Sequence, residues 1–533
     1  MATLYFGGDI ITMEETVSGT GLLEVNGLIR EVGDYRKLMS IRPSDTRLAN
    51  LRGKALLPAF IDAHSHLTSV ARTLDLVNLE GTSSFEELKE RIEKFCQERK
   101  IAPGKWISGF GYDHNFLREH RHPSKEVLDE VSPDNPIVIT HASGHMGVMN
   151  SKALQLMGID HRSEDPPGGM IGHLEGSHYP NGYLEETAFT SAISRMPLPS
   201  FEDRCRQLEK AEQIYFENGI TTIQEGLAKR DEWNLLLRMS EEGRLKSDVV
   251  CYADLKDHRT LFKESGARQN QYVGRLKMGG YKIFLDGSPQ GRTAWLREPY
   301  LKGDAGYRGY PIYSDHQVRQ MLTQAIADQG QILCHCNGDA AAEQMIRAYE
   351  EAGGKNFHMR PVMIHAQLVG QDQLKKMADL SMIASFFIAH TYHWGDVHLQ
   401  NFGSERAMKI SPAASAKNLG VCYTFHQDSP VLPPNMMEVL WCAVNRISRE
   451  GIVMGEDEKI NVYDALKGIT INAAYQYFEE DKKGSLRPGK LADLVILDRN
   501  PLRVPVNELR DIHVVETIKE GKAVFVRNPK EQA

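Results

Sequence analysis

The stretch LLPAFIDAHSHL, residues 56–67, decides the fold, because it joins an apolar strand pattern to a terminal His-x-His pair. In an extended segment alternate side chains share a face, so His64 and His66 are predicted to point one way and Ser65 the other. Neutral imidazoles are good ligands for zinc and similar divalent cations. The pair alone leaves two interpretations open: a metal site, or one buried, hydrogen-bonded histidine beside one that faces solvent.

Composition bounds the class of protein. A chain of 533 residues predicts a large core with additions rather than one minimal domain. Its formal net charge of -8, with Lys and Arg spread along the chain, argues against a nucleic-acid partner. The first residues lack the pattern of a signal peptide, and no later segment reaches the roughly 18 apolar residues of a membrane span. We therefore expect a cytoplasmic protein without a membrane partner, and its seven scattered cysteines indicate reduced thiols.

Strand and helix patterns alternate from Ser200 onward. Ser200 and Asp203 resemble a capping box, which predicts a helix that ends at Asn218 and Gly219. The predicted strands that follow are residues 220–225, 249–254, 281–286, 331–336, 361–367, 382–387 and 421–428, with helices predicted at 233–242, 314–329, 340–352 and 371–378. With residues 56–67 the strands number eight, which predicts an α/β protein built on a (β/α)8 TIM barrel.

The segments outside this alternation predict additions to the barrel. Residues 4–52 form short β-rich runs separated by Gly and Asn turns. Residues 83–100 have helical periodicity, 136–142 have a strand pattern, and 170–184 have the pattern of a hairpin. The interval between the first barrel strand and Ser200 is therefore predicted to be an inserted α+β subdomain.

Four of the later strand patterns carry, at or near their ends, a residue that can hold a metal: Lys282, His335, His365 and Asp428. Active sites of such barrels lie at the carboxyl ends of the strands, so these side chains are expected to meet there. Any one of them could be a capped or solvated strand end. Four of them together with the His-x-His pair favour a metal site.

Neighbours of these residues narrow the chemistry. If His335 points into the barrel mouth, Cys334 and Cys336 point toward the helices, which makes them packing thiols rather than metal ligands. Lys282 as an ammonium ion has no lone pair to offer a cation. Two interpretations stay open for it: an ion pair with a carboxylate, or a deprotonated amine that adds carbon dioxide to form a metal-bridging carbamate.

Several longer motifs carry a family resemblance. They are PAFIDAHSH (58–66), SGHMGVMNSKAL (143–154), KIFLDGS (282–288), IHAQ (364–367), DSPV (428–431) and GSLRPGKLADLVILD (484–498). Together they span almost the whole chain, which resembles the amidohydrolase superfamily and, within it, the YtcJ-like branch related to N-substituted formamide deformylases.

The resemblance implies a domain layout and a metal centre. Both chain ends would join in a small β-sandwich, which gives three predicted domains: 1–55 with 485–533 (sandwich), 56–80 with 200–484 (barrel) and 81–199 (insert covering the active site). His64, His66 and Asp428 would hold a buried metal ion and His335 and His365 a second, bridged by N6-carboxylated Lys282. The expected cofactor is one or two divalent ions, with Zn²⁺ the first choice.

The same resemblance implies hydrolysis of a non-peptide amide C–N bond, linear or cyclic, in a small molecule such as an N-substituted formamide or an N-acyl amine. Metal-activated water would attack the carbonyl, and Asp428 would carry the proton from the water to the departing amine. The alternative is hydrolytic deamination of an amino-heterocycle. Deaminases of this superfamily typically have a Glu three residues after the fifth-strand His and lack the strand-four Lys, whereas this chain has Gly338 and Lys282. A third hypothesis is a metal-free scaffold, which the full ligand set disfavours.

Other residues have less specific predictions. Asp113, His145 and Arg292 resemble family positions near the site and are candidate substrate contacts, although each could be a turn residue or a local hydrogen-bond partner. His426 is predicted to be either a partner of the metal ligands or a packed histidine. Residues 390–398, rich in aromatics and histidines, are predicted to be an irregular loop that lines an apolar side of the pocket. A separate metal clip is an alternative there, but three histidines at these spacings are more often solvent-facing or stacked. A homodimer is expected because it is the commonest state of large enzymes.

Overall fold

The structure, a computed structural model, describes residues 2–142, 144–196, 199–301 and 305–528. Met1, Ser143 and residues 529–533, which belong to the predicted sandwich segments and to one quoted motif, lie outside the described residues. The chain divides into two units, Met1–Val70 with Leu208–Ala533, and Ala71–Gln207. Each unit is described by itself.

The first unit is built on one parallel sheet of eight strands, in the order β20-β19-β18-β17-β16-β15-β14-β7. Chain neighbours are therefore sheet neighbours, as in successive β-α-β units. The strands are β7 (Phe60–Ile61), β14 (Ile220–Ala228), β15 (Asp248–Asp254), β16 (Leu276–Phe284), β17 (Gln331–Cys336), β18 (Val362–His365), β19 (Ile383–Phe386) and β20 (Cys422–Phe425). Each of the eight predicted strands contributes to this sheet.

The sheet is curled, because side chains from its two ends share one core. Ile61 of β7 packs in the same cluster as Ile383 of β19 and partly buried Cys422 of β20, which stand at the opposite end of the strand order. Ala473 and Tyr477, which follow the sheet in the chain, fill the same cluster. This arrangement is consistent with a (β/α)8 barrel.

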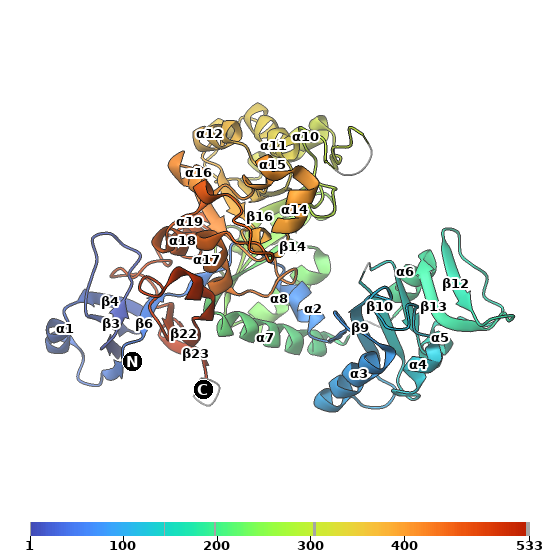
Figure 1. Ribbon diagram of the computed structural model, residues 1–533. Coiled ribbons are helices and arrows are strands. Elements are labelled where there is room, and N and C mark those ends of the chain that lie inside the picture. The colour runs from blue at the N-terminus through green and yellow to red at the C-terminus, as the bar shows by residue number, and fades with distance from the viewer. Residues whose placement is uncertain (1, 143, 197–198, 302–304, 529–533) are drawn as a thin grey trace. The chain divides into compact units, whose positions relative to one another are not determined.

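Helices follow the strands, as the sequence predicts. They include α8 (Arg230–Glu241), α10 (Asp315–Ala327), α11 (Asp339–Glu351) and α12 (Gln371–Asp379). The side chain of Ser314 accepts a hydrogen bond from the backbone of Gln317 and so caps α10. Helices α10, α11 and α12 lie side by side along the sheet (Figure 1).

The deciding stretch is two strands and not the single strand that its pattern predicts. β6 (Ala55–Pro58) pairs with β21 (Leu494–Leu497) in a second sheet, whereas β7 pairs with β14 in the parallel sheet. The chain changes sheet between Pro58 and Phe60. Proline has no N–H to continue the β6 ladder. The N–H of Ala59 donates to the carbonyl of Asp493, just before β21, whereas the N–H of Phe60 donates to the carbonyl of Gly219, just before β14.

The two ends of the chain contribute to two further sheets, one N-terminal and one with strands from both ends. One has the order β4-β3-β1-β5, from β1 (Ala2–Phe6), β3 (Gly21–Val25), β4 (Leu28–Gly33) and β5 (Arg47–Asn50). The other has the order β2-β6-β21-β22-β23, with β2 (Asp9–Ile10), β22 (Val514–Lys519) and β23 (Lys522–Val526). Tyr5 and Leu22 of the first sheet share a core with Leu56, Leu494 and Ile518 of the second, so the two sheets pack face to face.

The second unit is an α+β structure with one mixed sheet in the order β12-β13-β11-β10-β9-β8. Its strands are β8 (Leu76–Asn78), β9 (Ile107–Tyr112), β10 (Ile137–His141), β11 (Met146–Met149), β12 (Gly169–His173) and β13 (Pro180–Glu186). Its helices include α3 (Phe85–Arg99), α5 (Ser151–Met157) and α6 (Thr187–Ser194). Ile137 and Ile139 pack with α3, whereas Val138 packs with α5 and α6, so helices cover both faces. The observed division near Ala71 and Gln207 is wider than 81–199, and the three-domain layout stays a prediction.

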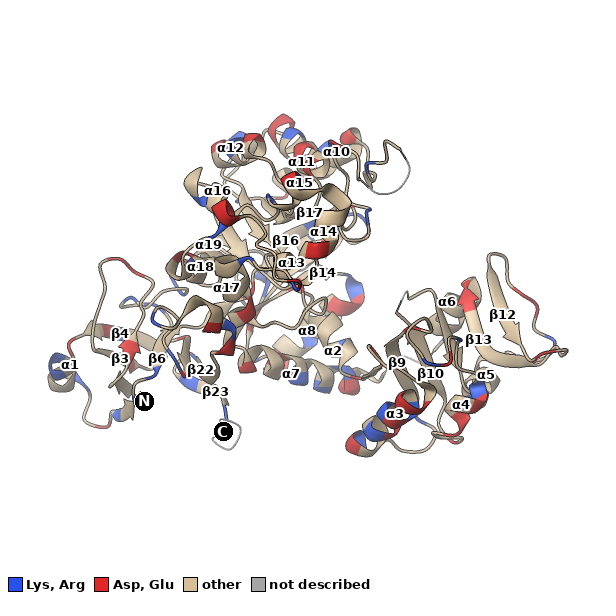
Figure 2. Ribbon diagram, in the orientation of Figure 1, with Lys and Arg blue, Asp and Glu red and all other residues tan. Residues whose placement is uncertain are grey.

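The helices carry both signs of charge. Lys and Arg stand beside Asp and Glu along α3 and α12 (Figure 2), so these helices present no single-sign surface to a polyanion. No helix within the described residues has both the length and the apolarity needed to cross a bilayer.

Candidate functional site

The residues predicted to hold metal come together at the carboxyl ends of the parallel strands. Lys282 lies near the end of β16, His335 lies in β17, and His365 is the last residue of β18. The His-x-His pair follows β7, and Asp428 follows β20 by three residues. All six side chains belong to the first unit.

His64, His66 and Asp428 form the tightest group. The Nε2 atoms of both histidines lie 3.4 Å from Asp428 Oδ1, and the ligand atoms of all three residues lie within 4.8 Å of one another. In a tetrahedral zinc site with bonds near 2.05 Å, two ligand atoms are separated by about 3.3 Å. The observed separations therefore suit three ligands of one ion.

Asp428 shows that these residues fit a cation. Its Oδ1 is buried and has no hydrogen-bond partner among the described residues. Burial alone would raise the pKa of Asp428, but electrostatic attraction to His66, with His426 and Lys282 nearby, brings the net pKa below its ordinary value. An anionic oxygen without a hydrogen bond is unfavourable in a protein interior unless a cation meets it.

His335 and His365 form a second pair beside the first group. His335 Nδ1 lies 3.1 Å from His365 Nε2, which in turn lies 3.9 Å from Asp428 Oδ2. His335 Nε2 lies 3.1 Å from the carbonyl of Gly287 and donates to it when protonated there. That tautomer leaves the Nδ1 lone pair facing His365.

Burial keeps three imidazoles of the site neutral. It lowers the pKa of His335 to about 4, with the Lys282 charge acting in the same direction, and it lowers the pKa values of His64 and His365 well below the ordinary value. A neutral imidazole offers the lone pair that a metal ion needs. His64, His335 and His365 are therefore in their ligand form at neutral pH.

Lys282 is fully buried among these groups. Its Nζ lies 3.2 Å from His64 Nε2, and no carboxylate that the structure describes forms an ion pair with it. Burial lowers its pKa to about 8, although the Asp428 charge acts in the opposite direction. With a pKa of about 8, roughly a tenth of Lys282 is free amine at pH 7, which is the form that adds carbon dioxide.

His365 and Asp428 reach the site through unusual backbone conformations. Their φ angles are 71° and 53°, in the left-handed region that L-residues rarely adopt. Ile364, the preceding residue, packs in the core of the curled sheet. By strand alternation His365 would then point outward, and the positive φ accounts for its turn into the site.

Gln224 of β14 orients His64, a role that the sequence did not reveal. The Gln224 amide donates through Nε2 to the carbonyl of Ala63 at 2.8 Å and to the hydroxyl of Tyr477 at 2.8 Å. Its Oε1 must therefore accept the proton of His64 Nδ1, which lies 2.5 Å away. This leaves the Nε2 lone pair of His64 facing Asp428 and Lys282. The only signal in the sequence was a polar residue near the end of a predicted strand.

His426 lies against His365 rather than among apolar side chains alone. Its Nε2 is 3.2 Å from His365 Nδ1, and its own Nδ1 is 2.9 Å from Ser385 Oγ. Of the two interpretations left open by the sequence, these contacts favour a partner that positions His365, one of the predicted metal ligands.

Residues 390–398 are not an irregular loop, which corrects that prediction. They form α13 (His390–His393) and begin α14 (Gly395–Phe402). His390 Nδ1 and His398 Nε2 lie 3.1 Å apart in a buried, stacked pair. Consecutive helical N–H groups are satisfied within the segment, for example from Trp394 to His390.

Cys336 packs outward as residue parity predicts. Its Sγ lies 3.9 Å from Met345 Sδ of α11, and both Cys334 and Cys336 are fully buried. The adjacent His335 points to the other side, into the histidine group.

The predicted substrate contacts are not gathered by the first unit. Arg292 is exposed in the turn after β16, with a φ of 57°. Asp113 and His145 belong to the second unit, where His145 lies 3.2 Å from Glu186. Their contact with substrate stays a prediction.

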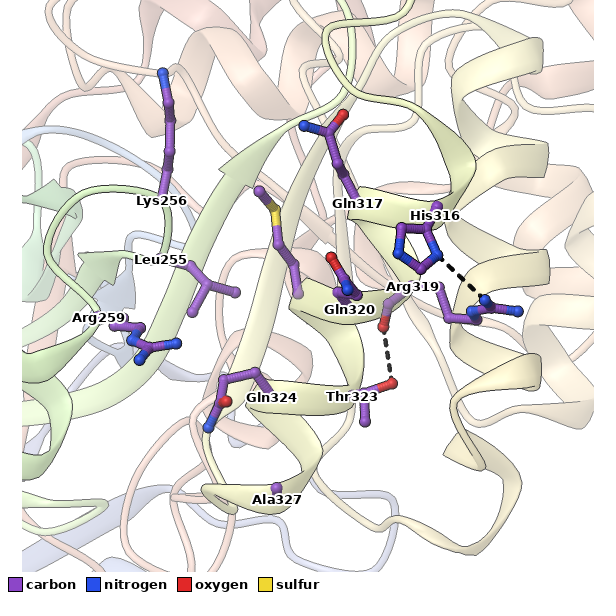
Figure 3. A pocket seen from close by; sticks show the side chains of 11 residues that line it. Leu255, Lys256, Arg259, His316, Gln317, Arg319, Gln320, Thr323, Gln324 and Ala327 are labelled. Carbon is purple, nitrogen blue, oxygen red and sulfur yellow. Dashed lines mark hydrogen bonds between the residues drawn. The ribbon is translucent and has the colours of Figure 1, made fainter.

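A large cleft lies elsewhere in the first unit. Its volume is about 760 Å³, and its walls are the segment Leu255–Arg259 and helix α10 (Figure 3). None of the six predicted metal ligands is among its lining residues in the described part of the chain. We assign it no part in the chemistry.

A buried carboxylate without a hydrogen bond, faced by imidazole nitrogens at the carboxyl ends of parallel strands, is an arrangement that suits a metal-dependent hydrolase. Comparison with known proteins agrees: a model described as the amidohydrolase family matches residues 47–525, and the chain belongs to that family. The predicted resemblance is confirmed. The protein is thus a hydrolase acting on C–N bonds, and its family implies a divalent metal ion.

Individual relatives are distant but cover nearly the whole chain. N-substituted formamide deformylase of Arthrobacter pascens is 27% identical over 95% of this chain and 95% of its own. The putative amidohydrolase YtcJ of Bacillus subtilis is 25% identical over 99% of this chain and 100% of its own. A crystal structure of an uncharacterized metal-dependent hydrolase from Pyrococcus furiosus has a TM-score of 0.78 and 26% identity, covering 94% of this chain and 100% of that one.

Proposed function

We propose that the enzyme hydrolyses a non-peptide amide C–N bond, linear or cyclic, in a small molecule, with N-substituted formamides and N-acyl amines as the first candidates. The observation that carries the proposal is the buried Asp428 Oδ1, which has no hydrogen bond and faces two imidazole nitrogens. The similarity to a formamide deformylase, at 27% identity, supports the choice of substrate class.

The donor set fits one or two divalent ions, with zinc the first choice. His64, His66 and Asp428 would hold one ion, and His335 and His365 a second. Lys282, as a carbamate, would supply oxygens to both. When bound, such ions lower the pKa of water and polarise a carbonyl oxygen.

The chain's own residues supply proton transfer and orientation. Asp428 accepts the proton lost as water adds to the amide carbon, and returns it to the nitrogen as the C–N bond breaks. Gln224 holds His64 in one tautomer, and Gly287 does the same for His335. The products are a carboxylate, formate in the case of a formamide, and an amine.

The finer architecture is part of the proposal. We place a closed (β/α)8 barrel at residues 56–80 and 200–484, a sandwich at 1–55 and 485–533, and an α+β insert at 81–199. We also propose that the protein is a cytoplasmic homodimer. Light scattering of the purified protein measures its oligomeric state.

The test of function is a hydrolysis screen with zinc-loaded enzyme. The substrates are N-formyl amines, N-acyl amino acids, cyclic amides and aminopurines. Asp428→Asn is expected to lower kcat at least about 100-fold, because it removes the proton carrier. Asp379→Asn, at the exposed end of α12, is the matched control and should leave kcat unchanged. Turnover of aminopurines alone would instead identify a deaminase.

A further inference from the structure

Two neighbouring parallel strands of the second unit end beside each other. β9 and β10 pair in parallel, and His141, the last residue of β10, stands opposite Tyr112, the last residue of β9. Asp113 and His114 follow Tyr112 directly. A register shift between Thr140 and His141 marks a bulge at this edge, a feature that often redirects a side chain.

Three ligand atoms converge at this edge. His114 Nδ1 lies 3.3 Å from His141 Nε2, which lies 3.4 Å from Asp113 Oδ1, and the third separation, His114 Nδ1 to Asp113 Oδ1, is 3.8 Å. These distances surround the value of about 3.3 Å expected between two ligands of one tetrahedral zinc ion. They also resemble the separations among His64, His66 and Asp428.

Surrounding side chains hold these groups in place. The backbone and side-chain nitrogens of Asn115 both lie 2.9 Å from Asp113 Oδ1, which fixes the carboxylate. The His122 ring lies 4.0 Å from the His114 ring and stacks on Tyr183, with centroids 4.4 Å apart. Its Nδ1 is 3.0 Å from the hydroxyl of Tyr112. Ligands of metal sites in proteins are typically held by such outer contacts.

The burial of the three groups is graded. The side chain of His141 is 9% exposed, whereas those of Asp113 and His114 are 25% and 29% exposed. His141 is thus inside the unit, whereas solvent reaches Asp113 and His114. Three protein ligands with an accessible fourth position form an open site rather than a closed structural one.

We propose that Asp113, His114 and His141 bind one divalent transition-metal ion of the zinc class, separate from the ions at the ends of the barrel strands. The ion joins the segment after β9 to the end of β10. Asp113 is then a metal ligand, in place of the substrate contact that the sequence suggested. All three ligands lie within the second unit, so the site does not depend on the reaction proposed for the first.

The test measures zinc binding by the full-length protein. Chelator-treated wild type, Asp113→Asn, His114→Gln and the control His161→Gln, an exposed histidine of the same unit, are titrated with zinc, and bound metal per chain is determined by mass spectrometry. Asp113→Asn and His114→Gln are each expected to weaken one equivalent by more than about tenfold. His161→Gln should bind as wild type does.

Two further measurements keep the result decisive. Asp428→Asn should retain the equivalent that Asp113→Asn weakens, which separates the two sites. Circular dichroism in chelator identifies any variant that fails to fold, and the more exposed His114 then carries the test. If both ligand variants fold and bind zinc with wild-type stoichiometry and affinity, the three residues are a hydrogen-bonded cluster and the proposal is wrong.

Discussion

At the scale of the residue, the site depends on which nitrogen of each histidine carries a proton. Gln224 settles this for His64, because its amide donates to Ala63 and Tyr477 and can only accept from His64. A substitution that removes this acceptor frees the ring to rotate or to change tautomer. The effect should fall on metal affinity before it falls on the fold.

Gln224→Ala is therefore expected to weaken zinc binding by about 10- to 100-fold. Gln320→Ala, on the exposed face of α10, is the control and should bind zinc as wild type does. Competition against a chromophoric chelator measures both affinities. Equal affinity in Gln224→Ala and wild type would show that His64 needs no help from Gln224.

At the scale of the element, strand ends position the ligands, and β18 does so through a strained turn. His365 and Ala366 both have positive φ, 71° and 46°. A β-branched side chain at such a position is strained by about 1–2 kcal/mol. Strain at Ala366 would also displace the adjacent His365.

Ala366→Val should therefore lower the melting temperature and metal affinity together. Overpacking alone would destabilise any buried alanine, so the matched control is Ala384→Val in β19, where the backbone is extended and the residue is equally buried. The expected result is a larger loss of zinc affinity in Ala366→Val than in Ala384→Val. Melting temperature is measured by thermal unfolding and zinc affinity by chelator competition. Equal losses of zinc affinity in the two variants would show that backbone strain at Ala366 does not affect the site.

The sequence predicted the secondary-structure elements better than the directions of their side chains. Periodicity identified all eight strands of the parallel sheet, and parity correctly turned Cys336 toward α11. Parity could not place His365, because a single positive φ reverses the side-chain direction. Nor could hydrophobic pattern show that the chain leaves one sheet for another at Pro58, because both strands are equally apolar and buried. The candidate ligands came from the predicted strand ends, their division between two ions came from family resemblance, and Gln224 came only from the structure.

At the scale of the whole molecule, buried ion pairs connect the β2-β6-β21-β22-β23 sheet to the parallel sheet. Asp248, the first residue of β15, accepts hydrogen bonds from Lys483 at 2.6 Å and from Lys519 of β22 at 2.7 Å. Lys519 also lies 2.7 Å from Asp493. Burial alone would raise the pKa of Asp248, but the two ammonium groups lower it well below its ordinary value.

Asp248→Asn is expected to destabilise the protein at pH 7 by about 3–5 kcal/mol, because it leaves buried lysines without their partner. A depressed carboxylate pKa stabilises the fold above the unfolded-state pKa, near 3.9, and this contribution is lost as the pH falls below that value. The difference in the free energy of unfolding between variant and wild type should therefore become smaller below about pH 4. The control Glu242→Gln, in an exposed ion pair with Arg238, should change little. Thermal unfolding from pH 7 to pH 3 gives both results, and a variant as stable as wild type at pH 7 would contradict this role.

We propose that side chains distant in sequence gather around a divalent cation at the carboxyl ends of the parallel strands. Anomalous diffraction at the zinc edge, from crystals of catalytically active enzyme, is the direct test of this arrangement. We expect a peak bonded to His64 Nε2, His66 Nε2 and Asp428. Active crystals with no anomalous peak among these three side chains would contradict it.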